Sequence, residues 1–355
     1  MRRQTTVMKK NQEAGSFKAL IFSGFFLILF LASTMPVLAS GGHEEEGEKF
    51  NPSELINHHI SDAHSWEITH GVVIHLPVIV YSEEHGLDVF SSSNFYNENH
   101  EVVPYKDYIL EHEHIHMANG HHVFDISLTK NVLFLLINSV ILLLVFFSVA
   151  RGYKRNAGSA PRGIQSFFEP IILYVRDEIV KPNIGPKYER YLPFLLTLFF
   201  FIWFGNLLGL LPGAANLTGN IAVTLTLATI VLVITLFSGN KVYWSHIFDP
   251  LGPGMPWLAK IPLYIILWPI ELIGILTKPF SLTIRLFANI TAGHIIILSI
   301  ISLTFIAQSI MVGIGATLFA TVMNMLELFV AILQAYVFTL LASMYFGQAV
   351  EEHHH

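Results

Sequence analysis

The feature that most constrains this chain is the near absence of charge between residues 191 and 350. The charged side chains in that stretch are Lys241, Asp249, Lys260, Glu271, Lys278, Arg285 and Glu327. In the whole chain 13% of the residues are charged and 53% are hydrophobic, whereas a soluble domain carries about 25% charged residues. The sequence therefore predicts an all-α polytopic membrane protein in a lipid bilayer, with about five membrane helices.

Composition also excludes several classes of function. The 355 residues include no cysteine, and the net charge is −6. A disulfide scaffold needs cysteine, and a nucleic-acid-binding domain needs a basic surface. We therefore expect neither a disulfide framework nor a nucleic-acid partner.

Residues 1–39 have the pattern of a signal peptide. Basic residues up to Lys18 precede an apolar run over 19–38, and Val37, Leu38 and Ala39 suit cleavage before the next residue. An uncleaved membrane anchor is the alternative, because the apolar run is long. Both interpretations place the following segment outside the cytoplasm.

Residues 40–130 are acidic and hold most of the 18 histidines. The tracts 111–116 and 121–122 could bind a divalent metal, or they could be solvated histidines that respond to external pH. We favour the second interpretation and predict no metal site, because alternate residues do not converge on one helix face. The alternation over 71–81 predicts a strand or two.

The membrane segments follow. Residues 131–150 carry no charge and are long enough for a first span. Residues 151–190 hold eight Lys or Arg and four acidic residues, so the positive-inside rule makes them cytoplasmic. Within them, apolar residues at helical spacing over 164–180 predict an amphipathic helix on the membrane surface.

Residues 191–350 form the predicted membrane channel domain. The apolar stretches 191–211 and 220–237 each suit one span. The last two, 261–305 and 311–346, exceed the length of a perpendicular span and predict long, tilted helices. Prolines at 269 and 279 are the predicted bend points of the first of these.

Arg285 is the residue whose chemistry most needs an explanation. It lies among apolar residues, where an arginine costs about 2.5–3.5 kcal/mol and stays charged. The spacing of 3.6 residues per turn places Glu271, Ser281 and Asn289 on the same stripe. We interpret Arg285 as a fixed cation that faces a carboxylate. The alternatives are a buried structural ion pair and a side chain that extends to the membrane edge.

Further along, His294 and Glu327 are titratable residues at membrane depth, and Gln334 shares a helix face with Glu327. A histidine and a glutamate that reach one another can pass a proton. Glutamine does not ionise, but it can hydrogen-bond an acid or a guanidinium. A core histidine held by hydrogen bonds is the alternative for His294 alone.

At these residues the chain resembles subunit a of F-type ATP synthases. The arginine motif over 279–294 (PFSLTIRLFANITAGH) and the glutamine motif over 333–341 (LQAYVFTLL) carry the resemblance. The motifs over 205–212 and 220–225 support it more weakly. Together they cover roughly residues 125–350, and residues 1–124 match no part of the family's core.

The resemblance implies a proton-translocating subunit that is not hydrolytic by itself and needs no cofactor. Arg285 would separate two half-channels and meet the carboxylates of the c-subunit ring, with Gln334 as its partner. The half-channel open to the outside would use His294, Glu327, Asn289, Asn206 and Asn220. The half-channel open to the cytoplasm would use Glu271 and Ser281.

The family also implies b-type peripheral stalk subunits, the whole ATP synthase and a bacterial inner-membrane location, with an extracytoplasmic N-terminal region and a cytoplasmic C-terminus. Two positions depart from many bacterial members. The order of His294 and Glu327 is exchanged, and Asn220 stands where some members have aspartate. The alternative function is a secondary metal or cation transporter that collects metal through its histidine-rich segment.

Overall fold

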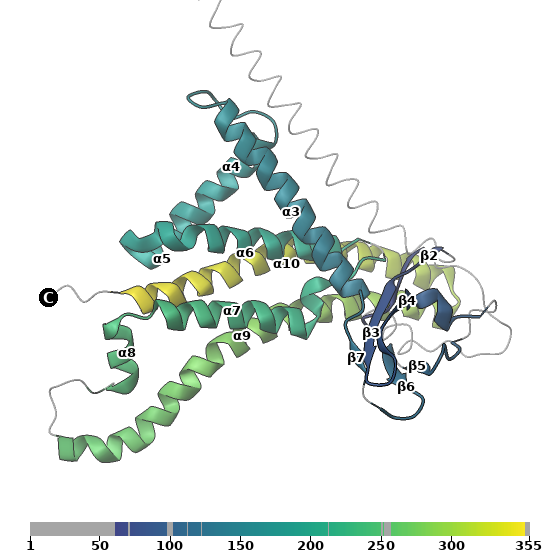
Figure 1. Ribbon diagram of the computed structural model, residues 1–355. Helices are drawn as coiled ribbons and strands as arrows, with labels where there is room; N and C mark the ends of the chain where they lie inside the picture. Colours follow the sequence, from purple (N-terminus) through teal and green to yellow (C-terminus); the bar gives the residue numbers. More distant parts are fainter. Residues whose placement is uncertain are drawn as a thin grey trace, which may run out of the picture.

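The computed structural model describes residues 61–69, 72–97, 102–111, 113–121, 123–211, 213–249, 251 and 257–351. The predicted signal peptide and residues 40–60 lie outside these ranges. The described chain is mainly helical, with a small region of β-strands at one end of a helix bundle (Figure 1). The C-terminal end of α10 lies at the other end of the bundle. We call these the β end and the C-terminal end.

The helices follow the predicted apolar segments. They are α3 (Lys130–Arg155), α4 (Ile164–Tyr174), α5 (Lys181–Ile184), α6 (Tyr188–Gly209), α7 (Ile221–Ser238), α8 (Lys241–Phe248), α9 (Trp257–Ala307) and α10 (Ile310–Val350). A π-helical stretch, η2 (Val175–Val180), joins α4 to α5, and short 3-10 turns η3 (Gly185–Lys187) and η4 (Leu217–Gly219) precede α6 and α7. Within the described ranges, five helical stretches are long and apolar enough to cross a membrane.

These helices confirm the all-α polytopic fold class. The last two are long, and α9 is visibly curved in Figure 1, with Pro269 and Pro279 inside it. The predicted amphipathic helix over 164–180 is present but continues through its π-helical part to residue 184. The short helix α8 was not predicted, although Asn240 caps it by accepting a hydrogen bond from Tyr243 N at 2.8 Å.

The helix bundle packs around a core of aromatic and small side chains. Phe200 on α6 and Phe346 on α10 are fully buried. The buried face of α10 is rich in small residues, which let membrane helices approach closely. At Gly347 an added Cβ would collide with the backbone carbonyl of Asn183, so this glycine permits the contact between α10 and α5.

The β region contains more strands than the one or two predicted over 71–81. Its elements are β1 (Ser65–Thr69), β2 (Val72–His75), β3 (Pro77–Ser82), β4 (Gly86–Ser91), η1 (Ser92–Phe95), β5 (Tyr108–Glu111), β6 (His114–Met117) and β7 (Phe124–Asp125). Antiparallel pairing gives one three-stranded sheet, in the order β4-β3-β7, and two hairpins, β1-β2 and β5-β6. Val78, Phe95 and Tyr108 lie in its core.

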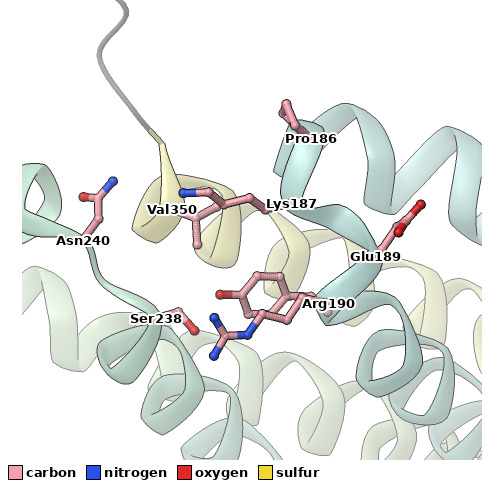
Figure 2. A pocket seen from close by; sticks show the side chains of 8 residues that line it. Pro186, Lys187, Glu189, Arg190, Ser238, Asn240 and Val350 are labelled. Carbon is pink, nitrogen blue, oxygen red and sulfur yellow. The ribbon is translucent and has the colours of Figure 1, made fainter.

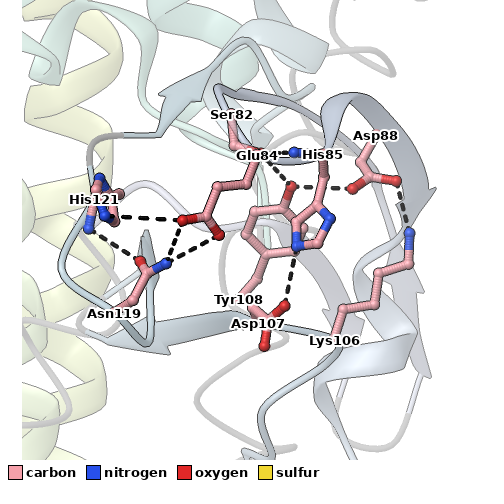
Figure 3. A network of polar contacts seen from close by, with 9 residues as sticks. All are labelled: Ser82, Glu84, His85, Asp88, Lys106, Asp107, Tyr108, Asn119 and His121. Atoms are coloured by element: carbon pink, nitrogen blue, oxygen red, sulfur yellow. Dashed lines mark hydrogen bonds and ion pairs between the residues drawn. The ribbon is translucent and has the colours of Figure 1, made fainter.

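Polar contacts surround one side of that core (Figure 3). The Tyr108 hydroxyl lies 3.1 Å from Ser82 Oγ and donates to Asp88 Oδ2 at 3.0 Å. Lys106 Nζ contacts the other oxygen of Asp88 at 2.6 Å. His85 Nε2 meets Asp107 Oδ2 at 2.9 Å. These contacts satisfy the polar end of a buried tyrosine, as such groups require.

The structure corrects our reasoning about the histidine tracts. We treated the segment as helical, but residues 114–117 form strand β6, where alternate residues share a face. His114 and His116 accordingly lie on the exposed face with ring centroids 6.4 Å apart. Among the described residues, no three His, Asp or Glu side chains converge closely enough to hold a metal ion. His112 and His122 lie outside the described ranges.

His64 is a buried histidine in the β region, and it lies between two acidic side chains. Its ring Nε2 lies 3.2 Å from Asp125 Oδ2, and Nδ1 lies 3.7 Å from Glu113 Oε2. Burial disfavours the charged ring, but the hydrogen bond with Asp125 and the attraction of both carboxylates outweigh it and raise the pKa of His64 from 6.5 to about 9. The protonated ring thus links β7 to the loop before β6.

This shift predicts that the β region loses stability in alkaline solution. A raised histidine pKa contributes stability that is complete below pH 6.5 and is lost as the pH passes about 9. The contribution is about 3 kcal/mol. Amide hydrogen exchange of residues 65–125 in the whole complex, corrected for intrinsic rates, should show weaker protection at pH 9.5 than at pH 6.5. His64→Gln should remove the pH dependence of amide protection, and His85→Gln should keep it. Equal protection of the wild-type protein at both pH values would contradict a stabilising role for protonated His64.

Trp66 anchors the β region to the helix bundle. Its indole packs edge-on against Phe134 of α3, with ring centroids 5.1 Å apart. Its Nε1 donates a hydrogen bond to the carbonyl of Gly213, after α6, at 2.8 Å. The backbone N–H of Lys130 also donates to the carbonyl of Ala63 at 2.8 Å. The β region is therefore held directly over the loop between α6 and α7.

Candidate functional site

The arginine predicted to be central lies on an outward face of α9. Arg285, Ser281 and Asn289 are all exposed, as their shared stripe requires. Around them the surface is apolar, with Phe280 64% and Phe329 64% exposed. In the described part of the chain, Arg285 makes no hydrogen bond and no ion pair. A permanent cation thus lies on an apolar helix surface, and no described residue of its own chain supplies a counter-charge.

Gln334, its predicted partner, is buried on α10, which packs along α9. No hydrogen bond joins Gln334 to Arg285 within the described ranges. Arg285 is within electrostatic range of Tyr345 on α10, and the centroid of the Tyr345 ring lies 5.2 Å from Lys278 Nζ. The pairing of Gln334 with the arginine therefore stays a prediction.

The structure does bring His294 and Glu327 together. His294 Nδ1 on α9 lies 3.3 Å from Glu327 Oε1 on α10, and both side chains are largely buried. The other ring nitrogen, Nε2, lies 3.2 Å from the carbonyl oxygen of Gly209. Because a carbonyl can only accept, Nε2 carries a hydrogen, and the contact between Nδ1 and the carboxylate shares a single further proton. This arrangement can take up and release one proton.

Gly293 makes the close approach of these two residues possible. A Cβ added at this position would collide with Glu327 Oε1. The glycine on α9 therefore leaves the space that the carboxylate from α10 occupies. Neither Gly293 nor Gly209 was singled out from the sequence, because a glycine in an apolar helix carries no chemical signal of its own.

Asn206 is a buried connector between helices. Its Nδ2 donates to the carbonyl of Ala331, one turn after Glu327, at 3.1 Å. Its Oδ1 accepts from Thr218 Oγ1 at 2.5 Å. Asn206 thus links α6 and η4 to the part of α10 that carries the glutamate.

Asn220 is the residue that caps α7. Its Oδ1 accepts from the backbone N–H groups of Ala222 and Val223 at 2.8 and 3.4 Å. Such a side chain satisfies N–H groups that have no partner in the helix. An asparagine directly before the helix is sufficient to explain this capping role. Asn220 also lines a small hollow at the β end.

At the C-terminal end, Glu271 has a partner that the sequence did not reveal. His246 Nδ1 on α8 lies 3.5 Å from Glu271 Oε1 on α9, with the histidine side chain 71% exposed. At a rise of 1.5 Å per residue, Glu271 lies about 21 Å and His294 about 14 Å from Arg285, on opposite sides. One titratable pair therefore flanks the arginine toward each end of α9.

A hollow of about 550 Å³ lies elsewhere (Figure 2). It is lined at the C-terminal end by Pro186, Lys187, Glu189, Arg190, Tyr191, Ser238, Asn240 and Val350. None of these is a predicted site residue. The predicted site residues are therefore spread over α6, the start of α7, α9 and α10, and none of them lines this hollow.

Comparison with known proteins shows the family of the chain. The family model for the ATP synthase A chain matches residues 132–347, which include every residue of the two flanking pairs. The chain belongs to the subunit a family of F-type ATP synthases. A second family model, described as a domain of unknown function, matches residues 55–133.

Relatives of subunit a extend over much of the chain. ATP synthase subunit a 2 of Chlorobaculum tepidum is 39% identical over 318 residues, which cover 88% of this chain and 76% of that protein. ATP synthase subunit a of Anaeromyxobacter is 36% identical over 326 residues, covering 89% and 74%. That of Pelodictyon phaeoclathratiforme is 47% identical over 232 residues, covering 63% and 66%.

Membership of the subunit a family confirms several predictions. The chain is a multi-pass membrane protein and a non-catalytic subunit of the ATP synthase complex, which is an ion-transporting assembly.

Proposed function

We propose that this subunit a provides two half-channels that load and unload the carboxylates of a c-subunit ring and couple proton flow to rotation. The observation that carries the proposal is the exposed Arg285 on an apolar surface, without an acidic partner in the described chain. A charge at membrane depth is retained only where it is paired. The missing partner is therefore a carboxylate on another subunit.

The two flanking pairs supply the routes to that carboxylate. His294 and Glu327 lie toward the β end, where His294 also reaches Gly209. Glu271 and His246 lie toward the C-terminal end. A proton that enters through the first pair neutralises a ring carboxylate, which can then face lipid, because burying it ionised would cost far more. After rotation the acid releases its proton toward the second pair.

The orientation follows from the charge distribution. Residues 151–190 are basic, so the C-terminal end faces the cytoplasm of a bacterial cell and the β end faces outside.

Asn206 and Asn289 belong with the outer route, and Ser281 with the inner one. The complex would also include b-type peripheral stalk subunits. A unit charge driven by 100 mV gains about 2.3 kcal/mol, so several protons are needed for each ATP.

An exchange of the paired residues tests the outer route. The double variant His294→Glu/Glu327→His keeps one histidine and one glutamate at the same contact. We expect it to retain more passive proton conductance than His294→Ala or Glu327→Ala, which should each lose about 100-fold or more. The measurement is proton flux through membranes stripped of the catalytic sector. Equal conductance in the exchange variant and the alanine variants would count against a working pair.

A further inference from the structure

A small hollow lies where the β region meets the helix bundle. Its volume is about 210 Å³, enough for several water molecules. The described residues that line it are Asp62, Asn131, Asn216, Gly219, Asn220, Ile221 and Phe287. They come from the β region, α3, the loop before α7, α7 itself and α9. The hollow therefore lies at the junction of the two regions, and the β region contributes Asp62 to its lining.

Asp62 is the one ionisable side chain among those lining residues. Its Oδ1 accepts hydrogen bonds from the backbone N–H groups of Ala63 and Asn131, both at 3.0 Å. These bonds hold the carboxylate against the first turn of α3. Its other oxygen makes no hydrogen bond within the described ranges, and the side chain is only partly buried. That oxygen is therefore available to water in the hollow.

Polar groups continue inward from this hollow. Asn216 lines it, and its buried Nδ2 has no hydrogen-bond partner in the described structure. Thr218 Oγ1 lies 3.5 Å from Asn216 Oδ1 and 2.5 Å from Asn206 Oδ1. Asn206 then reaches the backbone of α10 one turn from Glu327.

Asn216 also lies close to Gly209, whose carbonyl contacts the histidine of the His294–Glu327 pair. Asn216 Oδ1 would lie 3.2 Å from a Cβ placed on Gly209, and the carbonyl of Gly209 contacts His294. A water bound to the unpaired Nδ2 of Asn216 would satisfy an atom that is otherwise costly to bury. The hollow and the pair His294–Glu327 are thus separated by a short run of polar groups.

We propose that Asp62, contributed by the β region, is the carboxylate that collects protons at the mouth of the outer half-channel. This inference rests on the proposed function, because it needs His294 and Glu327 to receive the proton. It gives the β region a role in proton entry. It also places an acid beside Asn220, which is uncharged in this chain.

The charges around Asp62 suit this role. Lys130, at the start of α3, interacts electrostatically with both Asp62 and Glu67, and Lys130 and His294 are also within electrostatic range of each other. The neighbouring lining residues of α7 and α9, Asn220, Ile221 and Phe287, carry no charge. His64, two residues after Asp62, is a second cation, but it is paired with both Asp125 and Glu113. With Asp62 and Glu67, the acids around the mouth outnumber the two cations, which raises the local proton concentration.

Asp62→Asn tests the proposal with little disturbance of the fold, because asparagine keeps the oxygen that Ala63 and Asn131 donate to. In the whole ATP synthase reconstituted in liposomes, we expect proton-driven synthesis to fall about tenfold. The loss should grow as the pH on the proton-source side rises, because free protons become scarce. Asp107→Asn is the matched control, since Asp107 pairs with His85 away from the hollow, and it should behave as wild type.

The decisive variant returns a carboxylate to the same hollow from another element. Asp62→Asn/Asn220→Asp should recover most of the lost rate, whereas a purely structural role of Asp62 would not be rescued. Wild-type rates for Asp62→Asn at every source pH, or no recovery in the double variant, would overturn the proposal. Glu327→Gln, measured alongside, distinguishes failure of the Asp62 proposal from failure of the proposed half-channel. If Glu327→Gln blocks proton flux while Asp62→Asn does not, only the role of Asp62 is wrong. If Glu327→Gln conducts normally, the outer half-channel itself is wrong.

Discussion

Replacing Arg285 with alanine is expected to abolish proton-driven ATP synthesis while the complex still assembles. Removing one partner of a buried charge pair costs about 3–5 kcal/mol, which corresponds to a loss of about 100-fold or more in rate. The fold should tolerate the change, because within the described ranges Arg285 bonds to no other residue of its own chain. Synthesis under an imposed proton gradient and a native gel of the solubilised complex measure the two effects.

Lys278 provides a matched control for Arg285. It is a second cation on α9, but it has partners on its own chain: its Nζ donates to Gln348 Oε1 at 3.2 Å and lies over the ring of Tyr345. Lys278→Ala should therefore retain most of the synthesis. Undiminished coupled synthesis in Arg285→Ala, or an equal loss in both variants, contradicts a specific role for the arginine. Loss of the whole complex from the membrane in Arg285→Ala would show instead that the arginine is structural.

The large elements were predictable because they depend on local composition. A run of about twenty apolar residues must become a membrane helix, and α3, α6 and α7 lie within a few residues of the predicted spans. The stripe through Arg285 was also predictable, because helical geometry alone places its members on one face. In the β region only β2 and β3 match the predicted alternation over 71–81. The other strands were not predicted, because polar and histidine-rich segments obscure the alternation that identifies strands.

Contacts between distant residues were beyond the reach of the sequence. His246 and Glu271 pair across a proline- and glycine-rich connection that carries no spacing signal. Trp66 and Gly213 are 147 positions apart. Their contact docks the β region on the bundle, where Asp62 lines a hollow together with residues of α3 and α7. The sequence indicated that His294 and Glu327 could pair, but not that a glycine makes the pairing possible.

Replacing that glycine with alanine is expected to block the outer route. In Gly293→Ala the new methyl group would occupy the position of Glu327 Oε1, so either the carboxylate leaves His294 or α9 and α10 separate. Overpacking of this kind costs about 1–3 kcal/mol, and loss of positioned proton transfer costs about 100-fold or more in rate. Helix propensity acts in the opposite direction, because alanine favours a helix over glycine by about 1 kcal/mol. Proton conductance should therefore fall although the isolated helix becomes more stable.

Two further variants separate the collision from a general effect of alanine on α9. Gly274 lies on the same helix with no atom within 4 Å of an added Cβ, so Gly274→Ala should conduct as wild type. Glu327→Asp shortens the side chain by one methylene, and in combination with Gly293→Ala it should restore part of the conductance by making room for the methyl group. If Gly293→Ala conducts as well as Gly274→Ala, the carboxylate is not held against Gly293 during transport, and the contact with His294 does not carry the proton.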